Sequence, residues 1–345
     1  MNAGMSFDAA LPVIFMALMG VSMLVYVISD GYDLGVGMLM HRATDAEKDV
    51  MVASIGPFWD ANETWLVLGI GLLLVAFPRA HGVILTALYL PVAAMLVGLI
   101  LRGVAFDFRY KARDAHQPRW DRLFWIGSGL AALAQGYMLG LYITGFARTP
   151  LGVTFALAIA LGLAAGYVLL GACWLLIKTS GALQLQAVRW ARRALLLCGI
   201  GVAAVSAATP LVSPPVFGKW FTLPNVVLLL PIPVATAALF LIAARALRRL
   251  PVRLGNGNEY GVWVPFACAI GIFVLAFYGL AYSLFPFIVI DQLTIWQAAS
   301  APEVLISSQH APSSTYPAAS PSAMASANVT PSQVRAKPVI YRPSM

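Results

Sequence analysis

The sequence predicts an all-helical integral membrane protein with eight transmembrane helices, and three observations support this fold class. First, 60% of the 345 residues are hydrophobic and only 10% are charged, whereas a soluble domain carries about 25% charged residues. Second, the mean hydropathy of +0.82 excludes a chain that is disordered throughout. Third, the apolar residues gather in eight stretches, each close to the ~20 residues that a membrane-crossing helix needs.

The eight predicted spans follow one another with short loops between them. Residues 1–10 contain no Lys or Arg, so the first stretch lacks the basic segment of a signal peptide and is expected to be a retained span. The spans are predicted at residues 11–40, 54–77, 82–106, 123–146, 151–177, 194–212, 224–244 and 261–290.

The basic residues predict the orientation of these spans. Most Lys and Arg lie in the loops after spans one, three, five and seven, whereas the loops after spans two, four and six carry only Arg79, Arg148 and Lys219. The positive-inside rule therefore predicts cytoplasmic basic loops and an N-terminus outside. Because the net charge of +8 is spread over short loops between apolar blocks, we expect no nucleic-acid partner.

The end of the chain differs in composition from the rest. Residues 298–345 are rich in Ser, Ala and Pro and contain no apolar run of span length. Such composition is typical of disordered segments. The sequence therefore predicts a transmembrane helical domain over residues 1–297 and a disordered tail over residues 298–345.

Polar residues that are costly in a bilayer are concentrated in the first three spans. A charged side chain at the bilayer centre costs at least ~2.5–3.5 kcal/mol, so such residues are candidates for function. The acids at 30 and 33 share a helix face, as do those at 60 and 63, because each pair is three residues apart. If span two starts near residue 52, Asp60 lies roughly 12 Å along its axis. The candidates are Asp30, Asp33, Asp60, Asn62, Glu63, Arg102 and Asp107.

Two interpretations of this cluster remain open from the residues alone. In the structural one, Arg102 neutralises one carboxylate and the other acids lie at the headgroup level. In the functional one, the acids form a hydrated intake for protons or cations on the cytoplasmic side, since one arginine cannot neutralise Asp30, Asp60 and Glu63 together.

Histidine and cysteine give no sign of a metal centre in this chain. His41, His81, His116 and His310 all fall in loops or the tail, although a buried haem usually needs an axial histidine. The three cysteines lie in apolar runs without metal-binding spacing. We therefore expect this polypeptide to ligate no haem and no other metal itself.

Three of the polar segments resemble one protein family. Residues 30–37 (DGYDLGVG), 59–65 (WDANETW) and 102–109 (RGVAFDFR) are similar to motifs in the first three spans of subunit II of the cytochrome bd-type quinol oxidases. Residues 120–136 fit the family's fourth span and its approach, and Glu63 with the short loops resembles the cyanide-insensitive branch.

The resemblance implies a specific assembly and activity. It implies two four-helix bundles plus a ninth span, in a bacterial cytoplasmic (inner) membrane. The partner would be a homologous subunit I that carries haems b and d, or a third haem b, and that oxidises quinol and reduces O2 to water. A small single-span subunit is a further partner that the family leaves open.

The resemblance also implies roles for individual residues. Asp60 and Glu63 would be the proton intake pair, Asp30 a relay, and Arg102 the counter-ion that tunes these acids. Supporting polar or ion-pair roles fall to Asp33, Asp107 and Asn62.

The sequence differs from the family pattern at one place, and one alternative function remains open. The Ser/Ala/Pro-rich tail stands where the family's ninth span is expected, so we hypothesise that this span is missing or was lost through a frameshift near Pro302. The alternative function is a stand-alone secondary transporter or cation channel, in which the same acids would bind a substrate cation.

Overall fold

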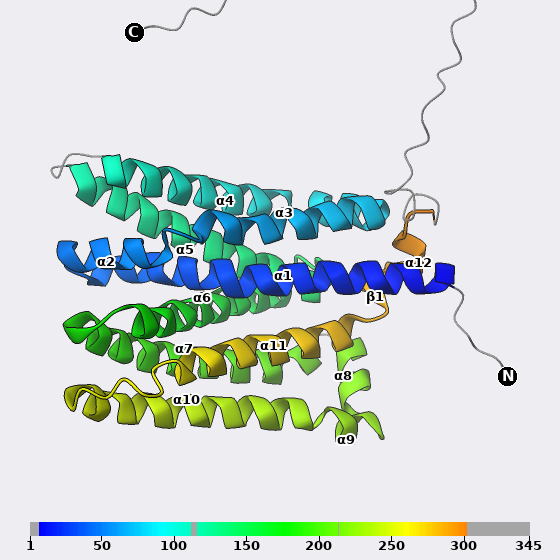
Figure 1. The fold of residues 1–345 in the computed structure, drawn as a ribbon. Helices are drawn as coiled ribbons and strands as arrows, with labels where there is room; N and C mark the ends of the chain where they lie inside the picture. Colours follow the sequence, from blue (N-terminus) through cyan, green and yellow to red (C-terminus); the bar gives the residue numbers. More distant parts are fainter. Residues whose placement is uncertain (1–6, 112–115, 213, 302–345) are drawn as a thin grey trace, which may run out of the picture. The chain divides into compact units, whose positions relative to one another are not determined.

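The computed structural model describes residues 7–111, 116–212 and 214–301, and these residues are almost entirely helical (Figure 1). Eight of the described helices are long and apolar enough to cross a membrane. The predicted all-helical class is therefore confirmed. The eight long helices are α1 (Phe7–Leu39), α3 (Trp59–Ala76), α4 (Pro78–Lys111), α5 (Gln117–Ile143), α6 (Pro150–Lys178), α7 (Gly181–Val212), α10 (Pro231–Gly255) and α11 (Val264–Leu284).

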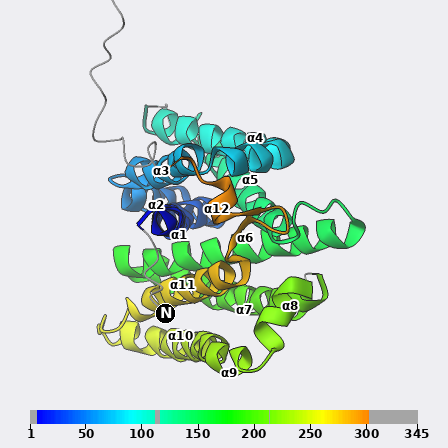
Figure 2. The same cartoon turned by 90° about the vertical axis from the view of Figure 1, so that its right-hand side faces the viewer.

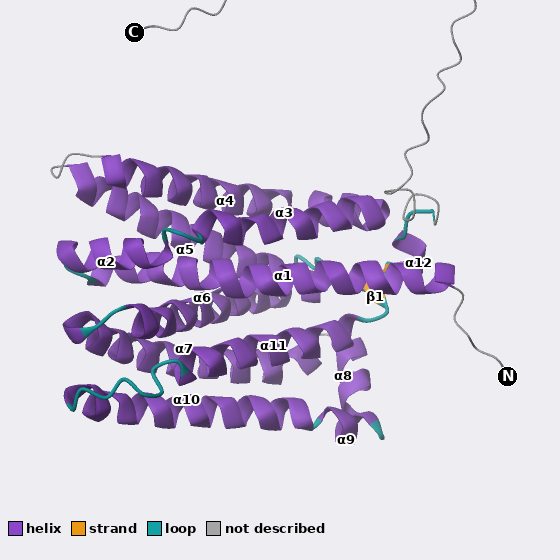
Figure 3. Ribbon diagram, viewed as in Figure 1, coloured by secondary structure: helices purple, strands orange, loops and turns teal. Residues whose placement is uncertain are grey.

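Shorter elements join the long helices, and the strands within residues 7–111, 116–212 and 214–301 form one small hairpin (Figure 3). The hairpin is antiparallel and pairs Phe287 with Thr294. The short elements are the 3-10 helix η1 (Met40–Arg42), α2 (Asp45–Ile55), α8 (Pro214–Phe221), α9 (Asn225–Leu229), β1 (Phe287–Val289), β2 (Leu293–Thr294) and α12 (Ile295–Ala298).

Four predicted spans need correction at their boundaries. The predicted second span began at residue 54, but residues 45–55 form a separate helix that starts with a capping box between Thr44 and Glu47. The predicted sixth span began at residue 194, whereas α7 begins at Gly181.

The predicted seventh span ended at residue 244, whereas the described span runs from Asn225 to Gly255. A break at Leu230, before the proline in the first turn of α10, divides this span into α9 and α10. The predicted eighth span ran to residue 290, whereas α11 ends at Leu284 and the hairpin follows.

The long helices pack as two four-helix groups. In the first bundle, α1, α3, α4 and α5 contact one another in a closed ring, and in the second bundle α6, α7, α10 and α11 do the same. Figure 2 looks along the helices and shows the first bundle above the second. The C-terminal ends of α1, α6 and α10 lie at one end of both bundles, on the left of Figure 1. We call this the basic end, because Arg42 follows α1 directly and Lys178 and Arg253 lie in the last turns of α6 and α10.

Glycine allows the two bundles to approach closely where α1 crosses α6. A Cβ added at Gly35 would lie 1.9 Å from the carbonyl oxygen of Tyr167, and one added at Gly171 would lie 2.4 Å from the backbone nitrogen of Val36. Small residues at helix crossings are the usual means of close packing in membranes, where lipid is as apolar as the side chains. Side chains at these two positions would therefore separate α1 from α6.

The segment after α11 returns over the first bundle at the end opposite the basic end. The Trp296 indole nitrogen donates to the carbonyl oxygen of Ala9 at 3.0 Å, and the backbone nitrogen of Ser300 donates to the carbonyl oxygen of Ala76 at 2.9 Å. Figure 2 shows α12 in this position. Residues 287–300 thereby tie the second bundle to α1 and to the end of α3.

The predictions for the end of the chain lie mostly outside the described residues. Residues 302–345 hold nearly all of the predicted tail and the place where the ninth helix is expected. The tail, the domain boundary at residue 297 and the loss of a ninth helix therefore stay predictions.

Candidate functional site

A polar stripe runs along one face of α1 inside the first bundle. It consists of Tyr26, Asp30, Asp33 and Gly37, which are spaced four, three and four residues apart and therefore share a face. All four residues are buried. From Tyr26 to Gly37 the stripe covers about 17 Å of helix, at ~1.5 Å per residue.

Arg102 of α4 lies opposite this stripe and joins three helices. Its Nη1 atom is 2.6 Å from Oδ1 of Asp30, and its Nη2 atom forms an ion pair with Glu63 of α3. Arg102 and Asp30 are 1% and 0% exposed, whereas the Glu63 side chain is 27% exposed. The indole of Trp59 also lies beside the guanidinium, with its ring centre 5.9 Å from Cζ.

Two glycines bring α4 close enough to α5 for Arg102 to reach the interior. A Cβ at Gly98 would lie 2.8 Å from the carbonyl oxygen of Gly127, and a Cβ at Gly127 would lie 2.8 Å from the backbone nitrogen of Arg102. Both clashes are with backbone, which cannot rotate away. The position of the guanidinium therefore depends on glycine at both sites.

Asp33 has a different environment from Asp30. Its Oδ2 atom accepts a hydrogen bond of 2.8 Å from Nδ2 of Asn62, which also donates to the Tyr32 hydroxyl at 2.8 Å. Asp33 is 0% exposed. In the described part of the chain, no Lys or Arg lies within ion-pair distance of this carboxyl.

Further into the bundle the stripe continues as neutral hydrogen bonds. The Gln135 amide nitrogen donates to the Tyr26 hydroxyl at 2.8 Å, and the Tyr167 hydroxyl donates to the Gln135 amide oxygen at 2.6 Å. These residues come from α1, α5 and α6, and all three are buried. Tyr26 and Tyr167 were not among the site residues predicted from the sequence, and the region of Gln135 was noted only through the family resemblance.

Several buried polar atoms of the cluster have no hydrogen-bond partner among the described residues. They are both carboxylate oxygens of Asp30, Oδ1 of Asp33, Nε and Nη1 of Arg102, and Oγ of Ser128. Nη1 of Arg102 and Oδ1 of Asp30 still form the ion pair described above. Buried polar groups are normally satisfied by protein or ordered water, so the remaining atoms mark positions where water or a proton would be stabilised.

The structure brings five of the seven predicted site residues together. Asp30, Asp33, Asn62, Glu63 and Arg102 form one connected cluster. By contrast, the side chains of residues 60 and 107 are exposed.

The predicted depth of Asp60 stays a prediction, because the helix that carries it starts later than expected. The estimate of 12 Å assumed a helix that starts near residue 52, but α3 starts at Trp59, so Asp60 lies in its first turn. Glu63 is one turn farther into the same helix, on the same face. Because α2 precedes α3 at the basic end (Figure 1), Asp60 and Glu63 lie part-way along the first bundle, near the level of Asn62 and its partner Asp33.

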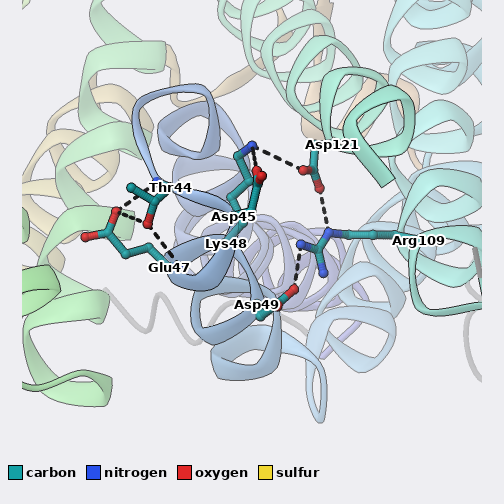
Figure 4. Close-up of polar contacts among 7 residues, drawn as sticks. All are labelled: Thr44, Asp45, Glu47, Lys48, Asp49, Arg109 and Asp121. Carbon is teal, nitrogen blue, oxygen red and sulfur yellow. Dashed lines mark hydrogen bonds and ion pairs between the residues drawn. The ribbon is translucent and has the colours of Figure 1, made fainter. Parts of the chain in front are cut away.

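A second polar network lies at the basic end and ties α2 to the first bundle (Figure 4). Lys48 of α2 contacts Asp45 at 2.8 Å and Asp121 of α5 at 3.3 Å. Arg109 of α4 contacts Asp49 of α2 at 2.8 Å and Asp121 at 2.5 Å. Burial lowers the pKa of Lys48, but the hydrogen bond with Asp45 and the charge of Asp121 outweigh burial and raise that pKa above its usual value.

The described residues offer no evident metal site. No group of three or more His, Cys, Asp or Glu within them is arranged to hold a metal ion. Within that part of the chain His41 and His116 are exposed and His81 is half-buried. That this polypeptide ligates no haem stays a prediction.

Comparison with known proteins identifies the family. Residues 11–310 match the family described as cytochrome bd terminal oxidase subunit II. The chain belongs to this family. The match covers most of the sequence and includes every residue of the buried cluster. Family membership and eight apolar helices together identify a multi-pass protein of a bacterial inner membrane.

Individual relatives of the bd oxidase subunit II family agree with this assignment. The chain is 33% identical over 187 residues to cytochrome bd-I ubiquinol oxidase subunit 2 of Escherichia coli K12, an alignment that covers 50% of this chain and 48% of the relative. It is 36% identical over 141 residues to cytochrome bd ubiquinol oxidase subunit 2 of Bacillus subtilis 168, covering 39% and 40%. The chain thus spans about half the length, or less, of these curated relatives.

A solved structure supports the fold. A chain of the bd oxidase from Geobacillus thermodenitrificans superposes with a TM-score of 0.69, covering 87% of this chain and 93% of that one. The sequence identity is 16%, so this likeness is evidence for the shared fold alone.

Proposed function

We propose that this chain is subunit II of a bd-type quinol oxidase complex. In this proposal a haem-bearing subunit I oxidises quinol and reduces O2 to water, and this chain supports that subunit and supplies protons from the cytoplasmic side. The observation that carries the proposal is a series of acids with decreasing exposure, the last two of which are joined by Arg102. Asp60 is exposed, the Glu63 side chain is 27% exposed and Asp30 is 0% exposed, in a family named for terminal oxidases.

The proposed roles follow from these positions. Asp60 takes a proton from water in the first turn of α3 and passes it to Glu63, one turn farther along the same face. Arg102 contacts both Glu63 and Asp30, so it keeps either carboxylate from being a lone buried charge while a proton moves between them. Asn62 orients Asp33 beside this route.

The oxygen chemistry belongs to the partner in this proposal. The haems, b and d or a third b, would supply electron transfer and O2 reduction there. The contribution of this chain is to deliver protons and to exclude lipid and water from the partner's interior. The orientation that fits this role has the basic end in the cytoplasm, as the basic loops predict.

The test is to isolate the chain with whatever co-purifies and to record reduced-minus-oxidised absorbance spectra. The proposal expects a second polypeptide with haem absorbance and quinol-dependent oxygen uptake. Asp60→Asn should slow oxygen uptake while haem content is retained, and Glu259→Gln, an exposed acid between α10 and α11, should leave uptake unchanged. A colourless single polypeptide that transports a solute would contradict the proposal, and unchanged uptake in Asp60→Asn would remove Asp60 from the path.

A further inference from the structure

The buried cluster contains more acids than its arginine neutralises. Asp30, Asp33 and Glu63 face the single guanidinium of Arg102, and Arg102 forms ion pairs with Asp30 and Glu63 only. If all three carboxyls were ionised, the cluster would carry a net charge of −2. A low-dielectric interior tolerates such an excess poorly, because buried charges are stable only when they are paired.

Asp33 is the acid for which the structure provides the least compensation. Its described polar contact is the neutral Asn62 amide at 2.8 Å, and one such hydrogen bond does not replace a counter-ion. Glu63 keeps access to solvent, and Asp30 has Arg102 at 2.6 Å. The excess charge is therefore most costly on Asp33.

Two orphaned oxygens indicate where a compensating proton would lie. Oδ1 of Asp33 and Oδ2 of Asp30 are both buried and have no hydrogen-bond partner among the described residues. The two side chains are three residues apart and share a face of α1. A hydrogen on Oδ1 of Asp33 would turn that atom into a donor, and the Asp30 carboxylate or a bound water would be its acceptor.

We propose that Asp33 holds a resident, exchangeable proton and acts as a store beside the route through Glu63. This inference rests on the proposed function, because the store serves proton delivery. The groups that face Asp33 are Asp30 and Tyr32 of α1, Asn62 and Glu63 of α3, and Arg102 of α4. When Asp33 passes its proton from Oδ1 to the Asp30 carboxylate or to a bound water, Asp33 becomes a carboxylate. A proton that arrives through Glu63 then restores the acid, and the charge of the cluster returns to its starting value once the first proton has left the cluster.

Infrared spectroscopy tests this store directly on the purified complex. A protonated carboxylic acid gives a C=O stretching band, distinct from carboxylate bands, that shifts in D2O when its proton exchanges. We expect such a band in spectra recorded during H2O-to-D2O exchange, and we expect it to be lost in Asp33→Asn. Glu259→Gln, which changes an exposed acid far from the cluster, should retain the band. Persistence of the full band in Asp33→Asn would overturn the proposal.

A second variant keeps the test decisive if Asp33→Asn does not assemble. Asn62→Leu removes the hydrogen bond to Oδ2 and leaves the acid in place, so the band should move to higher frequency without loss of intensity. A band that stays at the parent frequency in assembled Asn62→Leu would contradict the assignment. The infrared measurement needs neither haem nor turnover. Absence of a haem-bearing partner would therefore refute the proposed function, but the proton on Asp33 could still be measured.

Discussion

The two bundles of this chain have the same helical arrangement and different interiors. The first bundle buries Asp30, Asp33 and Arg102 between its helices. Within the described residues of α6, α7, α10 and α11, no charged side chain is buried to this degree. Since an apolar interior suffices for the second bundle, the charges in the first are not required by the architecture, and this difference supports a functional role for them.

Glycine contacts differ between the bundles in the same way. In the first bundle, Gly98 and Gly127 face backbone atoms of the neighbouring helix. In the second bundle, Gly271 faces the Cδ1 atom of Leu239, and the end of a leucine side chain can shift. At these positions the first bundle is the less tolerant of added volume, although Gly201 of the second bundle also faces backbone, because a Cβ added there would lie 3.1 Å from Cα of Gly162.

The largest effect is expected from Arg102→Met. It leaves Asp30 buried without a counter-ion, and loss of one partner of a buried pair costs about 3–5 kcal/mol. We expect little assembled complex and a lower melting temperature, measured as haem recovered per purified protein and by thermal unfolding.

The matched control for this prediction is Arg192→Met in the second bundle. Arg192 is exposed and donates to the carbonyl oxygen of Leu247 at 2.7 Å, so its loss should cost about 1 kcal/mol. Equal losses of recovered haem and of melting temperature in Arg102→Met and Arg192→Met would show that the first bundle does not depend on its buried charge more than the second bundle does.

An intermediate effect is expected from Gly127→Ala. The added methyl group would lie 2.6 Å from the carbonyl oxygen of Gly98 and 2.8 Å from the backbone nitrogen of Arg102, so α4 and α5 must move apart. Overpacking of this kind costs about 1–3 kcal/mol. Gly271→Ala should cost less because Leu239 can adjust. Melting temperatures of the two purified variants measure the difference, and the expectation fails if Gly271→Ala is the more destabilised.

The smallest effect is expected at the basic end, from Lys48→Met. Asp121 is 7% exposed but keeps its contact with Arg109 when Lys48 is replaced. We therefore expect a loss of about 1 kcal/mol, normal assembly, and faster exchange of the backbone amides of α2 with D2O. The pKa of Lys48 is raised in the folded protein. Its contribution is therefore present at neutral pH and lost as the pH rises through that raised value.

Hydrogen exchange followed by mass spectrometry, at neutral and alkaline pH, measures this contribution. Arg248→Met, an exposed position on α10, is the control that should leave α2 unchanged. If α2 of Lys48→Met exchanges like the parent protein at neutral pH, Lys48 does not hold this helix in place.

The sequence predicted the number of spans because hydropathy reports burial in lipid directly. It misplaced boundaries where local signals interrupt an apolar run, as at the capping box of Thr44 and Glu47 or at Pro231.

The candidate site was predictable to the extent that charges in spans are costly. That rule identified Asp30, Glu63 and Arg102, which the structure places in contact. It could not identify Tyr26 or Tyr167, because neutral residues in spans are common and these two meet through Gln135 only after α1, α5 and α6 have packed.

The return of residues 287–300 over the first bundle has a consequence for biosynthesis. Chains are made and fold from the N-terminus onward, so α1 and α3–α5 enter the bilayer early. Yet the contacts of Trp296 with Ala9 and of Ser300 with Ala76 form only after α11 has been synthesised. The first bundle is thus inserted first but receives its last contacts only after the second bundle has been made. A ribosome that stalls before residue 287 would leave the end of the first bundle opposite the basic end uncovered.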